Sequence, residues 1–358
     1  MLSFQRTLQK APLTNDVIMQ IPSLLRAAID ETLNGHGFGD LQRDFQQLSA
    51  AYARGRGESP FVDSEKKVLA YIATRMPSIY VVLRAILGEI ASRFPETPPR
   101  SLIDVGAGPG TVLWAASQIW ETLCTVRLFD HSALFRNVGQ RLVATSGHHL
   151  KEIISWEELD LRTQPLSLPA SVSLPASADL VTASYVLGEL SAPAQRTTVL
   201  SLWAATNRWL TLAEPGTPDG FRRILEARSL LLEQGAHIVA PCAAANDCPL
   251  PAHRWCHFTR RVERTRAQRA GKAATLGFED EPYSFLICSK IAPPPIRGRV
   301  LSSPTVLKHE ASIELCDNEN KLTTITARKS PTPARYRELA KKYRWGDFVT
   351  ELGETDSI

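Results

Sequence analysis

The sequence predicts an α/β protein whose largely parallel sheet follows a helical layer and precedes a cysteine-rich region with a small β element. Short apolar runs alternate with amphipathic segments from Ser101 onward, as in a parallel sheet covered on both faces. A glycine-rich turn follows the first of these runs. With 358 residues, 44% hydrophobic and 22% charged, the chain is long enough for about two domains, and its composition excludes a disordered or collagen-like protein.

The first 99 residues form the predicted helical layer. In residues 79–94, apolar side chains recur three and four positions apart, which lines one face of a helix. Pro77 separates this helix from a preceding one over Glu65–Arg75, and the proline-rich segment Pro95–Arg100 ends the layer. No stretch approaches 18 consecutive apolar residues, so we expect no membrane span.

Five strands follow this layer, with helices between most of them. They are Leu102–Val105, Thr125–Phe129, Ile153–Trp156, Leu180–Ser184 and Leu210–Ala213. A helix over Asp219–Leu232 and a buried strand over Tyr283–Cys288 come next. The runs SIEL and TTIT flank DNEN, which predicts a hairpin, and a basic helix over Ala334–Tyr343 ends the pattern. The twice-repeated SLPAS between Pro165 and Ser177 predicts a surface loop.

These elements divide the chain into five regions, and positive charge is concentrated in the later ones. The regions are a helical region (1–99), a sheet domain (100–240), a Cys/Arg-rich insertion (241–281), a last core strand with a hairpin (282–330) and a basic helix with a tail (331–358). The net charge is only +4, yet Arg254–Lys272 holds seven basic residues against Glu263, and Arg328–Arg344 holds seven against Glu338. Such clusters are typical of nucleic-acid-binding proteins, although a solvated helix face gives the same pattern.

The clearest motif is the glycine-rich turn Asp104-Val105-Gly106-Ala107-Gly108-Pro109-Gly110-Thr111, where the first predicted strand passes into a helix. Glycines in such a turn let the backbone approach a ligand closely, and the helix N-terminus offers N–H groups. Asp130 closes the second predicted strand, where an acidic residue commonly binds a ribose. The motif therefore predicts a nucleoside-containing cofactor; the alternative is a tight turn without a ligand.

Two cofactors compete for this turn. Dinucleotide binding requires G-x-G-x-x-G, whereas the third glycine here comes one residue early. Asp104 before the glycines and Pro109 among them favour S-adenosylmethionine over a nicotinamide cofactor. S-adenosylmethionine would bring its own reactive methyl group, so the protein would mainly position the acceptor.

The turn resembles motif I of the class I, seven-stranded methyltransferases, whose sheet is Rossmann-like. The resemblance implies that Gly106, Gly108 and Gly110 wrap the methionine and ribose of the cofactor. It also implies that Asp130 holds the ribose hydroxyls and that Asp160 faces the adenine.

No catalytic residue is assigned. The segment SYVLGEL, residues 184–190, occupies the acceptor-binding position but lacks the Asn/Asp-Pro-Pro-Tyr and Pro-Cys motifs of known acceptor chemistries. Glu189 and Tyr185 are candidate general bases, and core packing or helix capping is the alternative role for both.

Five of the six cysteines lie in the last third of the chain, and three of them fall within fifteen residues. Their spacing, Cys242-x5-Cys248-Pro249 and then x7 to Cys256, does not match the C-x2-C knuckles of structural zinc. Irregular spacing with a neighbouring proline and aromatics favours an iron–sulfur cluster, which takes four thiolates. Zinc is the alternative, with His253 and His257 as further ligands.

The fourth ligand has to come from farther along the chain. Cys316 ends a strand near a turn, where its side chain can reach out, whereas Cys288 lies in the apolar run FLIC and is predicted to be core. Cys124, at the start of the second strand, is predicted to be a small buried hydrophobe. The candidate metal ligands are Cys242, Cys248 and Cys256, with Cys316 favoured as the fourth.

Together, several segments resemble the methyltransferase-like assembly factors of the mitochondrial small ribosomal subunit and their bacterial relatives. The segments are LSAAYARGRG, AYIATRMPSIYVVLRAIL, DVGAGPGT, LAEPGTPDGF, APC-x5-CP, WCHF, FEDEPYSFL and ELC, from about Leu48 to Lys329. The cysteine spacing with WCHF is the most specific part. The resemblance implies a class I methyltransferase sheet with an N-terminal helical layer, and a cysteine-rich metal-binding and small β region at the C-terminal end.

The same resemblance implies a factor that binds the small ribosomal subunit or its rRNA and carries S-adenosylmethionine and a [4Fe-4S] cluster. The cluster ligands carry over to the four cysteines named above. We predict that the arginines directly after them contact RNA phosphates; these are Arg260, Arg261, Arg264 and Arg266. We expect a monomer when the protein is free.

Three functions are compatible with these observations. The first is an rRNA methyltransferase, the second a non-catalytic assembly factor that uses the fold as a platform, and the third, weaker one a nicotinamide-dependent oxidoreductase. The N-terminus MLSFQRTLQK resembles neither a secretory signal nor a long presequence, so we expect a bacterial cytoplasmic protein, with the mitochondrial matrix as the alternative.

Overall fold

The computed structural model describes residues 18–37, 39, 42–48, 62–146, 151–162, 177–245 and 247–350. Three sequence-based predictions lie wholly or mostly outside these residues: the LSAAYARGRG segment after Leu48, the SLPAS loop up to residue 176, and the tail after Thr350.

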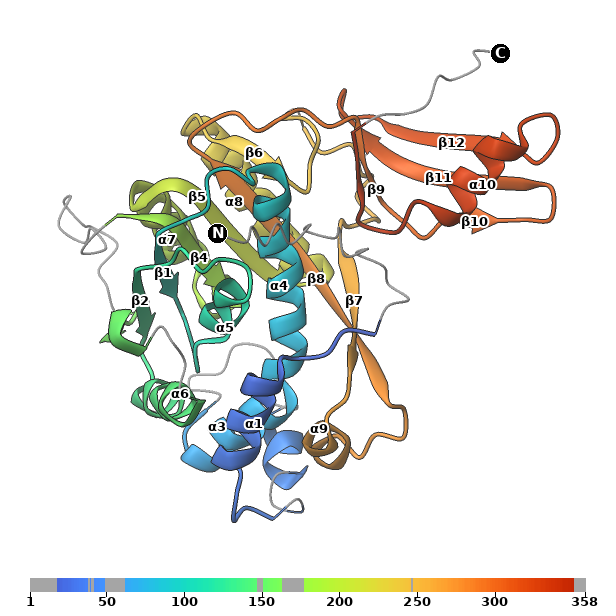
Figure 1. Ribbon diagram of the computed structural model, residues 1–358. Coiled ribbons are helices and arrows are strands. Elements are labelled where there is room, and N and C mark those ends of the chain that lie inside the picture. The colour runs from blue at the N-terminus through green and yellow to red at the C-terminus, as the bar shows by residue number, and fades with distance from the viewer. Residues whose placement is uncertain are drawn as a thin grey trace, which may run out of the picture.

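A mixed eight-stranded sheet forms the centre of the protein, in the order β3-β2-β1-β4-β5-β8-β6 with β7 paired to β8 (Figure 1). Its strands are β1 (Ser101–Val105), β2 (Thr125–Asp130), β3 (Ile154–Glu158), β4 (Ala178–Ser184), β5 (Thr206–Pro215), β6 (His237–Ala240), β7 (Phe258–Glu263) and β8 (Phe278–Ser289). This order is that of the class I methyltransferase sheet, so the predicted α/β fold is confirmed.

The predicted largely parallel sheet is confirmed: β1 to β5 pair parallel, β6 and β7 run in the same direction, and only β8 among these eight strands is reversed. Strand β8 runs antiparallel to both β5 and β6. It pairs antiparallel with β7 from Phe258↔Tyr283 to Glu263↔Phe278, and residues 264–277 connect the two strands. Strands β4 and β5 are buried along most of their length, as expected of central strands covered on both faces.

Helices cover both faces of the sheet. They are α1 (Ser23–Thr32), α3 (Glu65–Thr74), α4 (Met76–Arg93), α5 (Thr111–Ser117), α6 (Ala133–Ser146), α7 (Ala192–Ala204), α8 (Pro218–Glu233) and α9 (Arg266–Gly271), with 3-10 turns η1 (Lys151–Ile153) and η2 (Leu187–Glu189). One apolar core packs α1, α3, α4, α5 and α6 on one side of the sheet. A second apolar core packs α7 and α8 on the other side.

The predicted helix break at Pro77 is present. Helix α3 ends at Thr74 and α4 begins at Met76, with Pro77 in the first turn, where the missing N–H costs no helical hydrogen bond. In the part of the chain that the structure describes, no single helix is long and apolar enough to cross a membrane, but α3 and α4 together pass that test as a pair bent by 54°. Both helices are mostly buried within the protein.

Residues 298–350 form a small C-terminal module beside the main sheet (Figure 1). It contains β9 (Gly298–Val300), β10 (Thr305–Val306), β11 (Glu310–Asp317), β12 (Leu322–Arg328), α10 (Pro333–Lys341) and β13 (Phe348–Val349). The predicted hairpin is β11 with β12, which pair antiparallel in register from Glu310↔Arg328 to Cys316↔Leu322. The module has its own apolar core under α10.

Candidate functional site

The glycine turn lies at the carboxyl end of β1, between β2 and β4. Gly106, Gly108 and Gly110 all have left-handed backbone, with φ of 72°, 54° and 83°. A Cβ at Gly106 would lie 2.7 Å from the side chain of Val186, whereas nothing lies within 4 Å of a Cβ built at Gly108. The turn is therefore closed at its start and open above Gly108, where a ligand can reach the backbone.

Asp130 connects the end of β2 to this turn. Its carboxylate accepts hydrogen bonds from the N–H groups of Gly108 (2.7 Å) and Ser132 (2.8 Å), and the side chain is buried. Burial raises the pKa of Asp130, and the two backbone hydrogen bonds act against that rise. Two N–H groups use only part of the accepting capacity of a carboxylate, so Asp130 can still accept hydrogen bonds from ribose hydroxyls.

The other two predicted carboxylates have different surroundings. Asp104 is fully buried in β1 and accepts a hydrogen bond from the Thr182 hydroxyl at 2.6 Å. Burial raises the pKa of Asp104 to about 7. Asp160 lies after β3 and holds the Arg162 guanidinium with both oxygens at 2.9 Å, and this hydrogen bonding lowers the pKa of Asp160. The structure thus brings Asp104, Asp130 and the turn together and places Asp160 farther along the same sheet edge.

The two candidate bases follow β4. Glu189 ends the short turn η2, and burial, followed by the negative charge of Asp130, raises the pKa of Glu189 to about 7. Tyr185 has a left-handed backbone, with φ of 62°, and its buried hydroxyl has no hydrogen-bond partner among the described residues. Burial raises the pKa of Tyr185 well above its usual value, so this phenol stays protonated at neutral pH and is a poor base. Glu189 is therefore the better candidate.

Sequence reasoning missed two polar partners at this edge of the sheet. Thr182 hydrogen-bonds Asp104, and Glu214, at the end of β5, accepts from the Arg223 guanidinium at 2.7 Å and from the Leu187 N–H at 3.1 Å. A threonine within a strand carries no distinctive pattern. Glu214 stood in the quoted LAEPGTPDGF segment, but its partners come from two other elements and could not be read from its neighbours.

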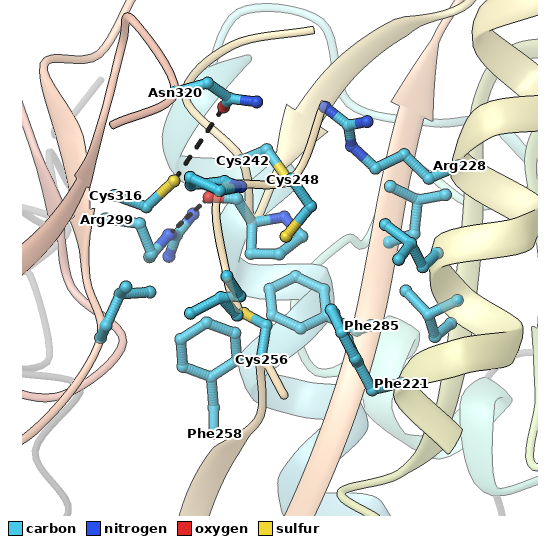
Figure 2. A pocket seen from close by; sticks show the side chains of 17 residues that line it. Phe221, Arg228, Cys242, Cys248, Cys256, Phe258, Phe285, Arg299, Cys316 and Asn320 are labelled. Atoms are coloured by element: carbon cyan, nitrogen blue, oxygen red, sulfur yellow. Dashed lines mark hydrogen bonds between the residues drawn. The ribbon is translucent and has the colours of Figure 1, made fainter. Parts of the chain in front are cut away.

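The four predicted ligand cysteines line one pocket between the main sheet and the C-terminal module (Figure 2). Cys242 follows β6, Cys248 and Cys256 lie in the connection to β7, and Cys316 comes from β11. Arg228, Arg299 and Asn320 also line the pocket, and Phe221, Phe258 and Phe285 line its end toward Cys256. Residues more than seventy positions apart in sequence therefore meet here.

The electrostatics of these thiols reflect their burial and closeness. Burial raises the pKa of Cys256 well above its usual value, and negative charge on the other three pocket cysteines would raise it further. Burial likewise raises the pKa of Cys316 to about 12, with Cys242 and Cys248 adding to the effect. Without a cation the thiols of Cys256 and Cys316 stay protonated, whereas a metal would bind them as thiolates and release protons.

Arg299 is the polar group that joins the parts of this pocket. Its buried guanidinium contacts Glu89 of α4 with both nitrogens, at 2.7 and 3.1 Å. The same group donates to the carbonyl of Pro241, next to Cys242, at 3.0 Å, and to that of Gly346 at 2.6 Å. In the sheet of the module, Arg299 pairs directly with Cys316.

The structure does not show a formed metal site in the described part of this predicted metal-binding region. Among residues 18–350, where described, no three His, Cys, Asp or Glu side chains surround a point that could hold one metal ion. Neither His253 nor His257 lines the pocket. Cys288 is buried in β8, as predicted, but the prediction for Cys124 is wrong: it precedes β2, is exposed, and donates its thiol to the Arg100 carbonyl.

The four arginines predicted to contact RNA lie on β7 and just beyond it. Strand β8 places the acids of the FEDE run opposite β7, so Arg261 pairs with Asp280 at 2.8 Å and Arg264 with Glu279 at 3.1 Å. Arg260 is buried, and Arg266 is exposed at the start of α9. Much of the charge of this cluster is therefore balanced within the protein, and RNA contact by these residues stays a prediction.

Comparison with known proteins places the chain in a family. A family model described as "Mitochondrial small ribosomal subunit Rsm22" matches residues 65–350. The human "Ribosome assembly protein METTL17, mitochondrial" is 26% identical over 365 aligned residues, which cover 97% of this chain and 72% of that protein. The "Rsm22-cox11 tandem protein 2, mitochondrial" of Schizosaccharomyces pombe is 25% identical over 364, covering 87% of this chain and 46% of the tandem protein. The chain thus spans about half the length of that relative.

Solved structures with a similar chain path include two methyltransferases. Magnesium protoporphyrin IX methyltransferase from Synechocystis PCC 6803 with bound SAH is 13% identical, with a TM-score of 0.39, and the match covers 75% of this chain and 100% of that one. An O-methyltransferase family protein from Burkholderia thailandensis is 14% identical, with a TM-score of 0.43, covering 74% and 72%. At these scores neither likeness adds to the argument from strand order.

These matches correct the expected cellular location and show the family of this protein. A bacterial cytoplasmic location is contradicted, because the family and these curated relatives are described as mitochondrial. That expectation depended on the first residues alone, a much weaker basis than a match along the chain. Since the family model covers the glycine turn and all four pocket cysteines, this protein belongs to the family described as mitochondrial small ribosomal subunit Rsm22.

Proposed function

We propose that this protein assists assembly of the small ribosomal subunit in mitochondria by binding its RNA, and that it carries S-adenosylmethionine and an iron–sulfur cluster. The observation that carries the proposal is the family match over residues 65–350, which includes both candidate sites. The human relative is described as a ribosome assembly protein, which supports the same role for this chain.

Cosedimentation tests the role in assembly. Tagged protein is expected to migrate with immature small subunits in a gradient of mitochondrial extract, and to leave that fraction when the extract is treated with ribonuclease. Migration at the top of the gradient in cells that are actively making ribosomes would contradict the proposal.

The glycine turn supports cofactor binding. The space above Gly108 is open, and the Asp130 carboxylate stands beside it with accepting capacity left for ribose hydroxyls. Asp104 and Glu189 add negative charge near the same place once they ionise, which suits a ligand with a sulfonium and an ammonium group. When bound, S-adenosylmethionine would supply an electrophilic methyl group. The chain's own residues would hold the nucleoside and exclude water.

Gly108→Asp should abolish S-adenosylmethionine binding without unfolding the protein. Nothing lies within 4 Å of a Cβ at this position, and aspartate tolerates the left-handed backbone better than most residues, but its carboxylate would fill the ligand space beside Asp130. Calorimetry is expected to show at least a hundredfold loss of affinity, or about 3 kcal/mol.

Gly235→Asp is the matched control. Gly235 also has a positive φ, of 74°, with nothing within 4 Å, but it lies between α8 and β6, at the opposite edge of the sheet. Equal affinities of the two variants for S-adenosylmethionine would show that the glycine turn is not the cofactor site. If the assembly role does not require the cofactor, the Gly108→Asp protein should still cosediment with small subunits.

Affinity for S-adenosylmethionine should rise with pH between 6 and 8. Burial raises the pKa of both Asp104 and Glu189 to about 7, so both are largely neutral at pH 6 and ionised at pH 8, and only the ionised forms attract a cation. We expect roughly a five- to tenfold gain per carboxylate. Asp104→Asn should reduce the slope, whereas Asp160→Asn should not, since hydrogen bonds from Arg162 lower the pKa of Asp160. A flat calorimetric profile for the unmodified protein would contradict this assignment.

Our choice of a cluster over zinc depends on the cysteine spacing, Cys242-x5-Cys248 and then x7 to Cys256, which does not match the C-x2-C knuckles of structural zinc. The described residues show no formed group for a single ion, and this finding does not distinguish the two metals. A [4Fe-4S] cluster takes one thiolate on each of four irons, so its ligands stand farther apart around a larger space. Four cysteines lining one apolar pocket, with the buried cation Arg299 beside them, suit that larger anion.

One observation favours a second function, methyl transfer to ribosomal RNA. Glu189 combines a pKa of about 7 with a place at the carboxyl edge of the sheet, next to Asp130, which suits a general base. Comparing modified nucleosides in small-subunit RNA from cells with the unmodified protein and with Glu189→Gln tests it. A methyl group lost only in the variant would establish turnover, and identical RNA in the two strains and in a deletion strain would exclude it.

A further inference from the structure

Three aromatic side chains form a ladder where the connection to β7 meets the C-terminal module. The rings of Trp255 and His257 are stacked, with centroids 5.3 Å apart and planes 23° apart. The ring of Trp345 meets His257 edge-on at 5.0 Å. Trp255 is 37% exposed, which is unusual for so large an apolar side chain. The cysteine pocket does not use these rings, since none of them lines it.

The ladder is held rigidly from both ends. The Trp255 indole N–H donates to the carbonyl of Gly216 at 3.0 Å. The residue after Trp345 is Gly346, whose carbonyl accepts from the buried Arg299 at 2.6 Å, and a Cβ at Gly346 would lie 3.0 Å from the ring of Phe258. A ring fixed in this way loses little conformational entropy when a planar ligand stacks on it.

The ladder lies on the side of the molecule where the candidate cofactor site opens. Gly216 directly follows β5, and β5 is separated from β1 only by β4. Neighbouring strands are about 4.8 Å apart, so the ends of β5 and β1 are roughly 10 Å apart along the same carboxyl edge. Trp255 therefore stands beside the edge that carries the glycine turn.

A segment rich in positive charge directly precedes one residue of the ladder, Trp345, in the sequence. The basic segment Arg328–Arg344, with seven cations against one acid, contains α10 and ends immediately before Trp345. Lys341 and Lys342 at the end of α10 are exposed. Arg254 is held by Glu314 at 2.7 Å. Lys342 pairs with Glu338 at 3.2 Å, but its side chain is 66% exposed, so Lys341 and Lys342 can both meet an outside anion.

We propose that Trp255, backed by His257 and Trp345, is a stacking platform for an unpaired base of RNA, with Lys341 and Lys342 contacting the phosphates next to it. Exposed aromatic rings beside clustered cations are how proteins bind single strands, because every base has a face to stack and every nucleotide a phosphate. The inference depends on the proposed function and adds to it the structural state of the RNA: single-stranded rather than duplex. The two sequence motifs involved, WCHF and the C-terminal basic run, meet only in the folded protein.

Binding of a labelled single-stranded RNA, and of the same RNA annealed to its complement, tests the platform in the full-length protein. Trp255→Ala is expected to weaken single-strand binding roughly 5- to 150-fold, since stacking on one base contributes about 1–3 kcal/mol, and to leave duplex binding unchanged. Trp255→Phe should keep most of the affinity because a ring remains. Replacing both Lys341 and Lys342 by alanine should lower the salt dependence, by about 0.7 in log–log slope for each phosphate that the variant no longer neutralises.

Ile291→Ala is the control, since Ile291 is 53% exposed and follows β8 at the opposite edge of the sheet. Because Trp255 adjoins Cys256, bound metal and melting temperature are measured for every variant, and Trp255→Phe serves if Trp255→Ala alters either. Equal single-strand affinity for the unmodified protein and for a well-folded Trp255→Ala overturns the platform but leaves RNA binding standing. Failure of the unmodified protein to bind either RNA overturns the RNA part of the proposed function as well.

Discussion

Cys316→Ser is expected to remove the iron–sulfur cluster that we propose and, with it, the brown colour expected of the anaerobically purified protein. Cys316 is the one pocket cysteine supplied by the C-terminal module, and a serine hydroxyl is a poor replacement for a thiolate on iron. Bound iron per chain, measured by elemental analysis, should fall severalfold, and visible absorption should fall with it. The melting temperature should fall too, because a ligand that binds only the folded state stabilises it.

Cys124→Ser and Cys288→Ser are the controls for this result. Cys124 is exposed and remote from the pocket, and Cys288 is buried in β8 but does not line it. Both variants should keep their iron. Iron retained by Cys316→Ser, or lost equally from Cys124→Ser, would show that the ligand set is wrong. If the unmodified protein is colourless and holds one zinc per chain, the proposed cluster is wrong and the bound metal is zinc.

Arg299→Met is expected to lower the free energy of unfolding by about 3–5 kcal/mol, the usual cost of removing one partner from a buried ion pair. Arg299 and Glu89 are both almost fully buried, and the substitution leaves the Glu89 carboxylate without its cation. It also removes hydrogen bonds to the carbonyls of Pro241 and Gly346, which adjoin the cysteine pocket and the aromatic ladder. Urea denaturation followed by circular dichroism measures the change.

Two further variants separate charge from size. In Glu89→Leu with Arg299→Met no buried charge is left unpaired, so this double variant should regain much of the lost stability. Arg222→Met breaks the exposed pair with Glu226, at 3.0 Å, and should cost less than about 1 kcal/mol. If Arg299→Met costs no more than Arg222→Met, the buried pair does not hold the module against α4.

The elements of the main sheet were predictable because their signals are local. An apolar run of four or five residues, a glycine turn after it and a helical period after that need no knowledge of distant residues. The predicted strand Leu102–Val105 is β1 almost to the residue, and the SIEL and TTIT runs form β11 and β12. Local pattern also separated Cys288, inside an apolar run, from Cys316, near a turn. It failed at Cys124, where the strand begins one residue later and the side chain stays outside.

Properties that depend on pairing between distant segments could not be obtained in this way. Asp280 and Glu281 lie opposite Arg261 and Arg260 only because of the β7–β8 register, and Glu279 pairs with Arg264 just beyond β7. Much of the charge of a run that is basic in sequence is therefore balanced in the fold. The reversal of β8 has the same origin. Arg299 showed no pattern of its own, yet it contacts a helix more than two hundred residues earlier.

By itself, then, the sequence determined the α/β class, the glycine turn with Asp130 at the next strand end, and the family, because residue type and short spacing carry these properties. Only the tertiary structure decided that four cysteines share one pocket, that Glu89 and Arg299 join the helical layer to the C-terminal module, and that Trp255 and Trp345 meet around His257. The physical reason is that burial and charge compensation are set by whichever segments come together in space, and the free energy of that choice is spread over the whole chain.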